Sequence, residues 1–257
     1  MTNEEILETA MRQSAIDSSC ISDDFKSLKN KVVISSANPN ARKYLELPFY
    51  CDLTSYGNNI VASVNADIFE TVKEYINSNN IEHCFETPAL YILNDKLKKY
   101  NMGICFMAEY FLPDINIIKP LKCGYKTKFL YPEDFSKLYL PEWSNALCEK
   151  RRHLDMLAVG AFDGRQLIGL AGASADCDSM WQIGIDVLPE YRQKGIASSL
   201  TSQLAFEILN RGIVPFYCAA WSNVKSVKNA LKSGFKPAWV QVTARSLDFI
   251  SEINKNN

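Results

Sequence analysis

The alternation of apolar and polar positions is clearest in the second half of the chain. Between Trp181 and Val187 apolar side chains recur at every second residue and end before Pro189, which predicts a strand. From Gly195 onward apolar side chains recur every fourth residue until Gly212 interrupts them, which predicts an amphipathic helix of about four turns. The charged segment between the two is therefore a turn that leads from a strand into a helix.

The other segments of the second half also carry clear periods. The run from Val214 to Ala220 is wholly apolar, which is typical of a buried strand. The helix that follows has Ser222 or Asn223 as its N-cap and ends at Gly234. The predicted elements are, in order, a helical stretch at 132–153 that breaks near Pro141, strands at 156–162 and 166–173 with a turn at Asp163-Gly164, a strand at 180–187, a helix at 195–211, a strand at 214–220, a helix at 224–232 and a strand at 235–243.

The first half is less regular, and we recognise no catalytic signature in it. Thr87 and Pro88 predict the N-cap and the first position of a helix in which Leu90, Leu93 and Leu97 face inward. The other predicted elements are a helix at 4–12, a short turn at 22–25, strands at 31–35 and 59–64, a helix at 67–77, a strand at 101–110 and a linker from 111 to about 125.

Length and composition fit an ordinary globular protein of one large domain or two smaller ones. The 257 residues are 47% hydrophobic and 22% charged. We expect an α+β region of unknown role at 1–120 and a second domain at 126–250. Lysine and arginine number 28 against 29 acidic residues, without a basic run, so the net charge is -1 and a nucleic-acid partner is not expected. A small partner is expected instead.

The N-terminus and the cysteines indicate a cytoplasmic protein. The first residues are acidic and amphipathic, unlike a signal peptide, and no apolar run reaches membrane-spanning length, so no membrane partner is expected. The eight cysteines are scattered without metal-type spacing and are expected to be reduced thiols. His83 and His153 stand far apart and lack recognisable zinc partners, so we expect no metal.

The turn before the helix at 195–211 has the properties of an anion site. The first N–H groups of a helix have no internal acceptor and lie at the positive end of the helix dipole. Gly195 lacks a Cβ, so a phosphate can approach the backbone there, and Arg192 and Lys194 add positive charge. An ordinary charged loop between a strand and a helix would have the same residues, and the turn alone leaves that alternative open.

Two separated motifs follow one another in the second half. The first is Val187-x-Pro189-x-x-Arg192-x-x-Gly195-x-Ala197, and the second, after a helix and an apolar strand, is Asn223-x-x-Ser226 with Gly234-Phe235. Together they resemble the GNAT superfamily of acetyl-CoA-dependent N-acetyltransferases, over roughly residues 126 to 246. The resemblance implies an α+β fold with a central mixed, mostly antiparallel sheet, a splayed strand pair and flanking helices, preceded by the N-terminal α+β region that some bacterial members carry. It also implies acetyl-CoA as the co-substrate.

The resemblance implies roles for individual residues as well. The backbone that pairs with the pantetheine arm of the cofactor is that of Ile185, Asp186 and Val187. The turn that holds the pyrophosphate consists of Arg192, Gln193, Lys194, Gly195, Ile196 and Ala197. Asn223 contacts the cofactor arm, and Ser226 and Asn229 are candidates for further contacts. The two strands splay to admit the thioester, whose carbonyl would lie between residues 181–186 and 217–222.

One position departs from the family pattern. Many members have a tyrosine, four residues before the Gly-Phe pair, that protonates the departing thiolate, and this chain has Ala230 there. Tyr217 and Cys218 on the preceding strand are alternative proton donors, and solvent is a third. Both side chains are equally explained as core residues, so the donor stays open.

Three carboxylates are candidates for the base that deprotonates the amine. Asp178 precedes the strand at 180–187, and Glu142 and Glu149 lie in the helical stretch that commonly walls the acceptor site in the family. Each is also explained as a solvated surface carboxylate. Asp186 is a different case, because a carboxylate beside a negative cofactor is costly. We expect its side chain to point to the opposite face and to pair with a cation.

Three functions stay open. The first is transfer of an acetyl or similar acyl group from CoA to a primary amine of a small molecule or peptide, by direct attack on the thioester. The second is a non-catalytic acyl-CoA-binding regulatory module, suggested by Ala230 and by the lack of an obvious base. The third is an adaptor in which residues 1–120 bind a protein partner. Three alternatives to the adaptor role also stay open for that region: it covers the cleft, it binds the acceptor, or it forms a homodimer contact.

Overall fold

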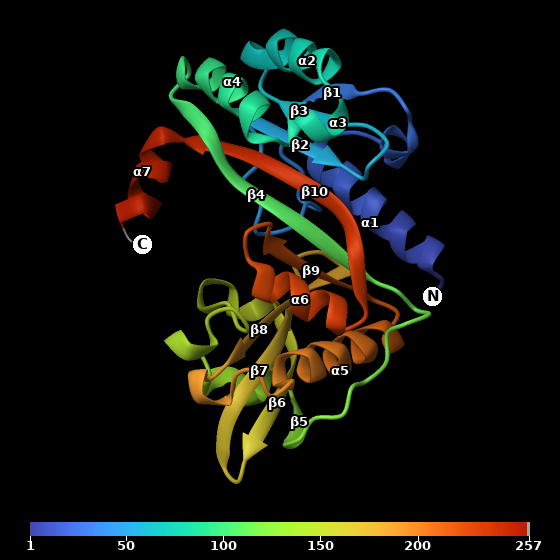
Figure 1. Cartoon of the computed structure of the whole chain (residues 1–257), viewed down its shortest axis with the longest axis vertical. Helices are drawn as coiled ribbons and strands as arrows, with labels where there is room; N and C mark the ends of the chain where they lie inside the picture. Colours follow the sequence, from blue (N-terminus) through green and yellow to red (C-terminus); the bar gives the residue numbers. More distant parts are fainter. Residues whose placement is uncertain (256–257) are drawn as a thin grey trace. The chain divides into compact units, whose positions relative to one another are not determined.

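The computed structural model describes residues 1–255 and shows an α+β protein with mostly antiparallel strands flanked by helices (Figure 1). This confirms the predicted fold class. The chain divides into two compact units, and each unit consists of two segments that are separate in the sequence. The first unit comprises Met1–Ala10 and Tyr110–Pro237, and the second comprises Met11–Glu109 and Ala238–Asn257. The units therefore differ from a single division between residues 120 and 126.

The first unit contains the strands predicted at 156–162, 166–173, 180–187 and 214–220, whereas most of the strand predicted at 235–243 belongs to the second unit. Its strands run in the order β4-β9-β8-β7-β6-β5. The pairs β5–β6, β6–β7 and β7–β8 are antiparallel, whereas β8–β9 is parallel. The bounds are Met102–Pro113 for β4, Lys126–Leu130 for β5, Asp155–Asp163 for β6, Gln166–Ser174 for β7, Met180–Val187 for β8 and Val214–Ala220 for β9.

Two helices, α5 (Ile196–Asn210) and α6 (Val224–Lys232), belong to the first unit. The apolar positions that recur along α5 are buried against β6, β7 and β8. Leu200, Leu204 and Ile208 of this helix are fully buried in one cluster with strand residues. The spacing of four residues thus predicted the buried face of α5 correctly.

The helical stretch expected at 132–153 is instead three short 3-10 turns. They are η3 (Pro132–Lys137), η4 (Pro141–Trp143) and η5 (Glu149–Leu154). Pro132 and Pro141 each stand at the start of a turn, which is where proline is tolerated because it has no N–H to donate. Each proline therefore opens a new short turn rather than continuing one helix.

The second unit has strands in the order β1-β3-β2-β10-β4. Leu90, Leu93 and Leu97 of α4 are buried in its core, as predicted, although Glu86 rather than Thr87 is the N-cap of that helix. The remaining bounds are Asn3–Ser18 for α1, which begins in the first unit, Ser22–Lys26 for η1, Lys31–Ile34 for β1, Cys51–Ser55 for β2, Val61–Val64 for β3, Ala66–Ile68 for η2, Phe69–Ser78 for α2, Ile81–Cys84 for α3, Thr87–Lys98 for α4, Phe235–Ser246 for β10 and Leu247–Lys255 for α7.

Four elements were not predicted, namely β2, α3, β5 and α7. Strand β2 alternates between apolar and polar residues only over Cys51–Thr54, and polar Asp52 and Thr54 are as buried as its apolar residues. The carboxylate of Asp52 accepts hydrogen bonds from Gln241 and Thr243 on the paired strand β10, which makes burial of these polar side chains tolerable. The expected linker from residue 111 was also wrong at its start, because β4 continues to Pro113.

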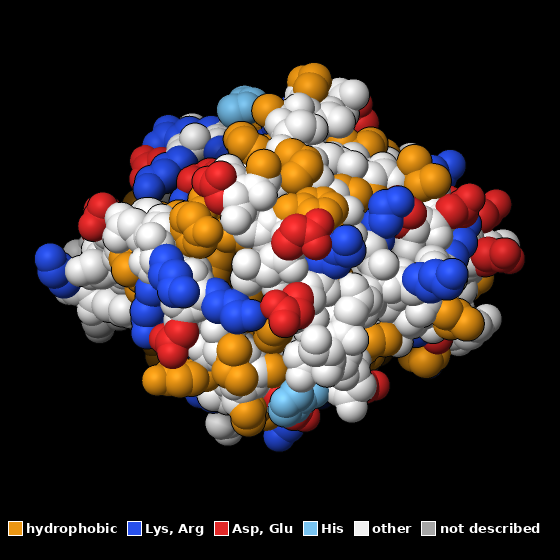
Figure 2. Space-filling model, turned by 90° about the horizontal axis from the view of Figure 1, so that it is seen from above, with side chains coloured by type: hydrophobic (Ala, Val, Ile, Leu, Met, Phe, Trp, Pro, Cys, Tyr) orange, Lys and Arg blue, Asp and Glu red, His pale blue; other side chains and the backbone are white. Residues whose placement is uncertain are grey.

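Neither a disulfide nor a metal site is found within residues 1–255. All eight cysteines are free thiols, and within this described part no group of three His, Cys, Asp or Glu side chains could hold a metal ion. None of the helices in the same range combines the length and the apolar character that crossing a bilayer requires. Figure 2 shows basic and acidic side chains interspersed on the face that it displays, in line with the net charge of -1.

Candidate active site

The turn between β8 and α5 has the backbone geometry that the sequence predicted for an anion site. Gly195 is the N-cap of α5 and has a φ of +80°, a conformation that side chains with a Cβ rarely adopt. The Ser199 N–H is the donor to the Gly195 carbonyl at 3.1 Å. The three amides at 196–198 precede it and have no acceptor within the helix. The positive end of the helix therefore faces the turn with free donors.

Side chains of the turn hold it in place. Arg192 Nε donates to the Val187 carbonyl at 3.0 Å, and the Tyr191 hydroxyl lies 3.1 Å from an Asp163 carboxylate oxygen. Lys194 lies over the Tyr191 ring, with Nζ 4.8 Å from its centroid. The turn is thus fixed to the sheet before any ligand binds, which lowers the entropy lost on binding.

Strands β8 and β9 pair only over their first residues. The ladder runs from Met180 opposite Val214 to Gln182 opposite Phe216, while β8 continues to Val187 and β9 to Ala220. Gln182 Nε2 lies 3.1 Å from Cys218 Sγ just beyond the last pair. Beyond this point β8 and β9 no longer pair with each other, although β8 stays paired with β7, and this is the splayed strand pair that the resemblance implied.

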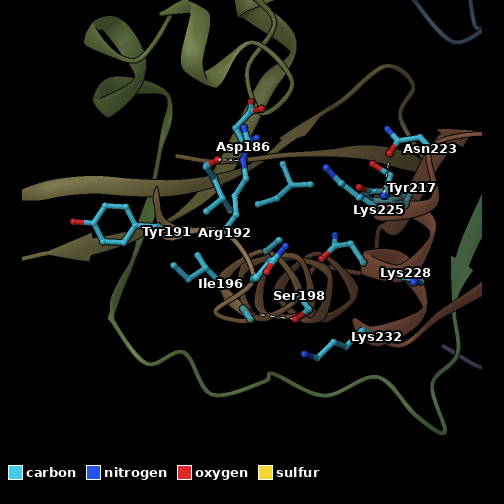
Figure 3. A pocket seen from close by; sticks show the side chains of 17 residues that line it. Asp186, Tyr191, Arg192, Ile196, Ser198, Tyr217, Asn223, Lys225, Lys228 and Lys232 are labelled. Carbon is cyan, nitrogen blue, oxygen red and sulfur yellow. Dashed lines mark hydrogen bonds between the residues drawn. The ribbon is translucent and has the colours of Figure 1, made fainter. Parts of the chain in front are cut away.

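Helix α6 is fastened beside the start of α5. Asn223 caps α6 by accepting the Ser226 N–H at 3.2 Å. The Asn229 amide donates to Thr201 at 3.1 Å, and the Ser233 hydroxyl lies 3.3 Å from the Ser198 carbonyl oxygen. These bonds set the distance between the two helices, which form opposite sides of a cavity (Figure 3).

That cavity has a volume of about 560 Å³ and is lined by the end of β8, the turn, the start of α5, Tyr217 in the middle of β9, and α6 with its N-cap. It brings together nearly all the residues predicted to bind the cofactor arm and pyrophosphate, and Lys194 is the exception. The predicted residues that line it are Ile185, Asp186, Val187, Arg192, Gln193, Gly195, Ile196, Ala197, Tyr217, Asn223, Ser226 and Asn229.

Five further lining residues were not predicted. They are Tyr191, Ser198, Lys225, Lys228 and Lys232. The lysines stand three and seven residues apart on one helix, a spacing that places them on one face, and this was the available sequence signal. Figure 3 shows them on α6, across the cavity from the labelled residues of α5.

Tyr217 is buried in the wall of the cavity, with 3% of its surface exposed. Burial raises the pKa of the Tyr217 phenol, and hydrogen bonds with the side chains of Ser226 and Asn229 oppose that rise. The phenol is therefore protonated at neutral pH. Ala230, at the usual tyrosine position, is fully buried among apolar side chains and does not line the cavity.

The predicted bases are not gathered at this cavity. Asp178, Glu142 and Glu149 are exposed, and none of them lines it. Glu149 forms an ion pair with Arg152. Their assignment as bases stays a prediction.

The expectation that Asp186 pairs with a cation was wrong. Its Oδ1 accepts from the Asn145 side-chain amide at 2.7 Å, and its Oδ2 accepts from the backbone N–H groups of Asn145 and Ala146 at 2.8 and 3.0 Å. A cation is unnecessary because a carboxylate with three N–H donors is already well satisfied. Two strand glycines permit this contact, since a Cβ on Gly184 or Gly172 would overlap the carbonyl oxygen of Asn145 or Ala146.

A family model described as GNAT acetyltransferase matches residues 93–238, which is more than half of the chain. The protein belongs to the GNAT acetyltransferase family. This confirms the resemblance drawn from the two motifs. No curated protein matches the chain.

The chain is also similar to solved structures. A GCN5-related N-acetyltransferase from Sphaerobacter thermophilus is 10% identical, with a TM-score of 0.50, over 95% of this chain and 93% of that one. A GNAT-family acetyltransferase from Novosphingobium aromaticivorans is 16% identical, with a TM-score of 0.44, over 56% of this chain and 66% of that one. A GCN5-related N-acetyltransferase-like protein from Streptococcus suis is 20% identical, with a TM-score of 0.44, over 62% of this chain and 69% of that one. This chain thus spans slightly less than two thirds of the Novosphingobium structure.

Proposed function

We propose that this protein transfers an acyl group, with acetyl-CoA as the donor, to a primary amine of a small molecule or peptide by direct attack on the thioester. The observation that supports this most is the cavity in which the start of α5, the end of β8 that no longer pairs with β9, and the Tyr217 wall meet. Its residues fit the chemistry of an acyl-CoA. Positive charge and free amides suit phosphates, while unpaired strand backbone suits an amide-bearing arm.

Residues of the cavity wall would bind the cofactor and align it for the transfer. The amides at 196–198 and Arg192 bind the pyrophosphate, and the backbone of 185–187 aligns the pantetheine arm. A bound thioester supplies an already activated carbonyl carbon. The neutral amine attacks that carbon, the C–S bond breaks, and the amine nitrogen loses a proton while the sulfur gains one. Positioning of the two reactants is the main contribution that the protein must make.

Tyr217 is the proposed donor to the sulfur. A phenol with a raised pKa holds its proton until negative charge develops on the departing thiolate, so it stabilises that charge by a hydrogen bond first. Ser226 and Asn229 orient its hydroxyl from α6. A side chain on β9 would thereby replace the tyrosine that Ala230 lacks.

The amine proton has no carboxylate acceptor in the cavity wall other than Asp186, whose oxygens are occupied by N–H donors. We therefore infer that the amine enters in its neutral form and loses its proton to water. Asp178 and Glu142 stay as sequence candidates for a base that receives it. Replacement of each by asparagine or glutamine tests them by the rate of thiol release at different pH values.

The function is tested by incubating the protein with acetyl-CoA and a panel of small amines and peptides while free thiol is measured. The expected result is amine-dependent thiol release with at least one acceptor. A rise in Tm with acetyl-CoA but no release with any amine would instead indicate a non-catalytic acyl-CoA-binding module.

The cofactor site is tested separately by Gly195→Glu. Its side chain would place a negative charge where phosphate binds, and glutamate is strained at a φ of +80°. We expect the rise in Tm caused by acetyl-CoA to disappear in this variant, and Gly124→Ala, with open space around the Cβ, to retain it. An unchanged rise in Gly195→Glu would refute the placement of the pyrophosphate.

A further inference from the structure

Three lysines form a row along α6 on the wall of the same cavity. Lys225, Lys228 and Lys232 all line it, and all three are exposed to solvent. Positions three and seven residues apart on a helix share one face, so the row extends over about two turns. Within residues 1–255 no ion pair of these three lysines with a carboxylate is present.

The charge of the cavity wall exceeds what a pyrophosphate alone would need. Arg192 and the three lysines of the row face one carboxylate, that of Asp186, among its lining residues. Asp186 already accepts three N–H groups from Asn145 and Ala146 and does not neutralise the row. The start of α5 adds further positive potential. An additional phosphate, separate from the pyrophosphate, would complement this excess.

The row lies close to the pyrophosphate turn. Asn229 and Ser233, which neighbour Lys228 and Lys232 in sequence, bond to Thr201 and Ser198 in the first turns of α5. The lysines at this end of α6 are therefore held next to the amides that bind the pyrophosphate. Their flexible side chains can reach a phosphate attached to the same ligand without movement of either helix.

We propose that the lysine row binds the ribose 3′-phosphate of CoA and makes the site selective for CoA over dephospho-CoA. Dephospho-CoA has the same thioester-forming arm and pyrophosphate but lacks this phosphate. This inference rests on the proposed acyl-CoA function and specifies which part of the ligand the α6 side of the cavity recognises. Lys228 and Lys232 contribute most because they stand beside the contacts with α5.

The test compares the Kd of CoA and of dephospho-CoA by calorimetry at low ionic strength. One exposed contact between a lysine and a phosphate contributes up to about fivefold in affinity, so two such contacts predict a preference for CoA of up to about 25-fold. The preference should shrink as salt is added, because exposed charges are screened. In Lys228→Gln/Lys232→Gln it should fall to about twofold or less.

The matched control is Lys126→Gln/Lys128→Gln, which removes two exposed lysines from β5, away from the lining residues. This variant should keep the wild-type preference. Equal binding of CoA and dephospho-CoA by the wild type, or an unchanged preference in Lys228→Gln/Lys232→Gln, would overturn the inference while leaving the proposed function standing. Absence of binding of either ligand to the wild type would refute the proposed function itself.

Discussion

At the scale of single residues, the candidate site departs from the family pattern at the position of the usual tyrosine. The usual tyrosine position is Ala230, and its methyl group is fully buried. Tyr217 lies on β9 instead, and its hydroxyl forms hydrogen bonds with two side chains of α6. Ser226 stands one turn before Ala230 on that helix, and Asn229 directly precedes it. A phenol is thus present in the cavity wall although the expected position lacks one.

Replacement of Tyr217 by phenylalanine tests its role as proton donor. The ring stays, so packing and acetyl-CoA binding should change little, while loss of the hydroxyl should lower kcat by about 100-fold, the usual scale of general acid catalysis. Because the pKa of Tyr217 is raised above 10.0, ionisation should slow the wild-type enzyme only at strongly alkaline pH, and the variant should lose that alkaline decline. Steady-state kinetics across pH measures both.

Cys218→Ala provides the comparison, because Cys218 is the alternative donor on the same strand. We expect a smaller loss of kcat in this variant. A larger loss of kcat in Cys218→Ala than in Tyr217→Phe would show that the Cys218 thiol is the proton donor. If both variants kept the wild-type kcat, solvent would be the source of the proton.

At the scale of elements, the sequence predicted what local periodicity governs. Strands β8 and β9 and helices α5 and α6 were placed within one or two residues, because their apolar spacing and their caps are both in the sequence. The helical stretch predicted at 132–153 was wrong because the backbone conformation of this segment depends on contacts outside it. Cys148 N–H donates to Asp155, and Asn145 donates to Asp186 on β8, so tertiary contacts replace helical bonds.

The close approach of this segment to the sheet gives a prediction about β8. A Cβ on Gly184 would overlap the backbone carbonyl of Asn145, and backbone cannot move aside as a side-chain tip can. Gly184→Ala should therefore lower the free energy of unfolding by about 1–3 kcal/mol, the usual cost of overpacking. Urea denaturation measures it, with Gly124→Ala as the matched control because its Cβ would meet no atom within 4 Å.

An unchanged urea midpoint of unfolding in Gly184→Ala would mean that the backbone at 145–146 can move away from the sheet to make room for the methyl group. The hydrogen bonds to Asp186 would then be weak as well. In that case Asp186→Asn should also leave stability unchanged, whereas a tightly held turn predicts that both variants lose stability.

At the scale of the whole molecule, the division into units could not be predicted from the sequence. Strands β4 and β10 each contribute residues to both units, and the N-terminal residues Met1–Ala10 group with the second half of the chain. Such exchange depends on long-range pairing, and local patterns carry no information about it. Polar residues buried by that pairing, such as Asp52 on β2, appeared as ordinary polar positions in the sequence.

Asp52 makes the stability of the protein depend on pH. Burial raises the pKa of its carboxyl to about 6, although hydrogen bonds from Thr243, Gln241 and Thr54 and the charge of Arg42 oppose the rise. In the unfolded chain the value is about 3.9. Between these values the folded protein holds a proton that the unfolded chain has lost. The contribution of Asp52 is therefore fully present below about pH 4 and is lost as the pH rises through about 6.

Asp52→Asn isolates this contribution. The amide keeps an oxygen that accepts from Gln241 and Thr243 and adds an N–H that can donate to Thr54, as the protonated acid does. Two pKa units correspond to roughly 3 kcal/mol, so the variant should gain up to that amount in unfolding free energy, relative to the wild type, between pH 4 and pH 7. Urea denaturation at both pH values measures the change, and Asp248→Asn, an exposed carboxylate of the same unit, should show no comparable gain. A constant difference between Asp52→Asn and the wild type would show that Asp52 is ionised throughout this range and that its hydrogen bonds outweigh its burial.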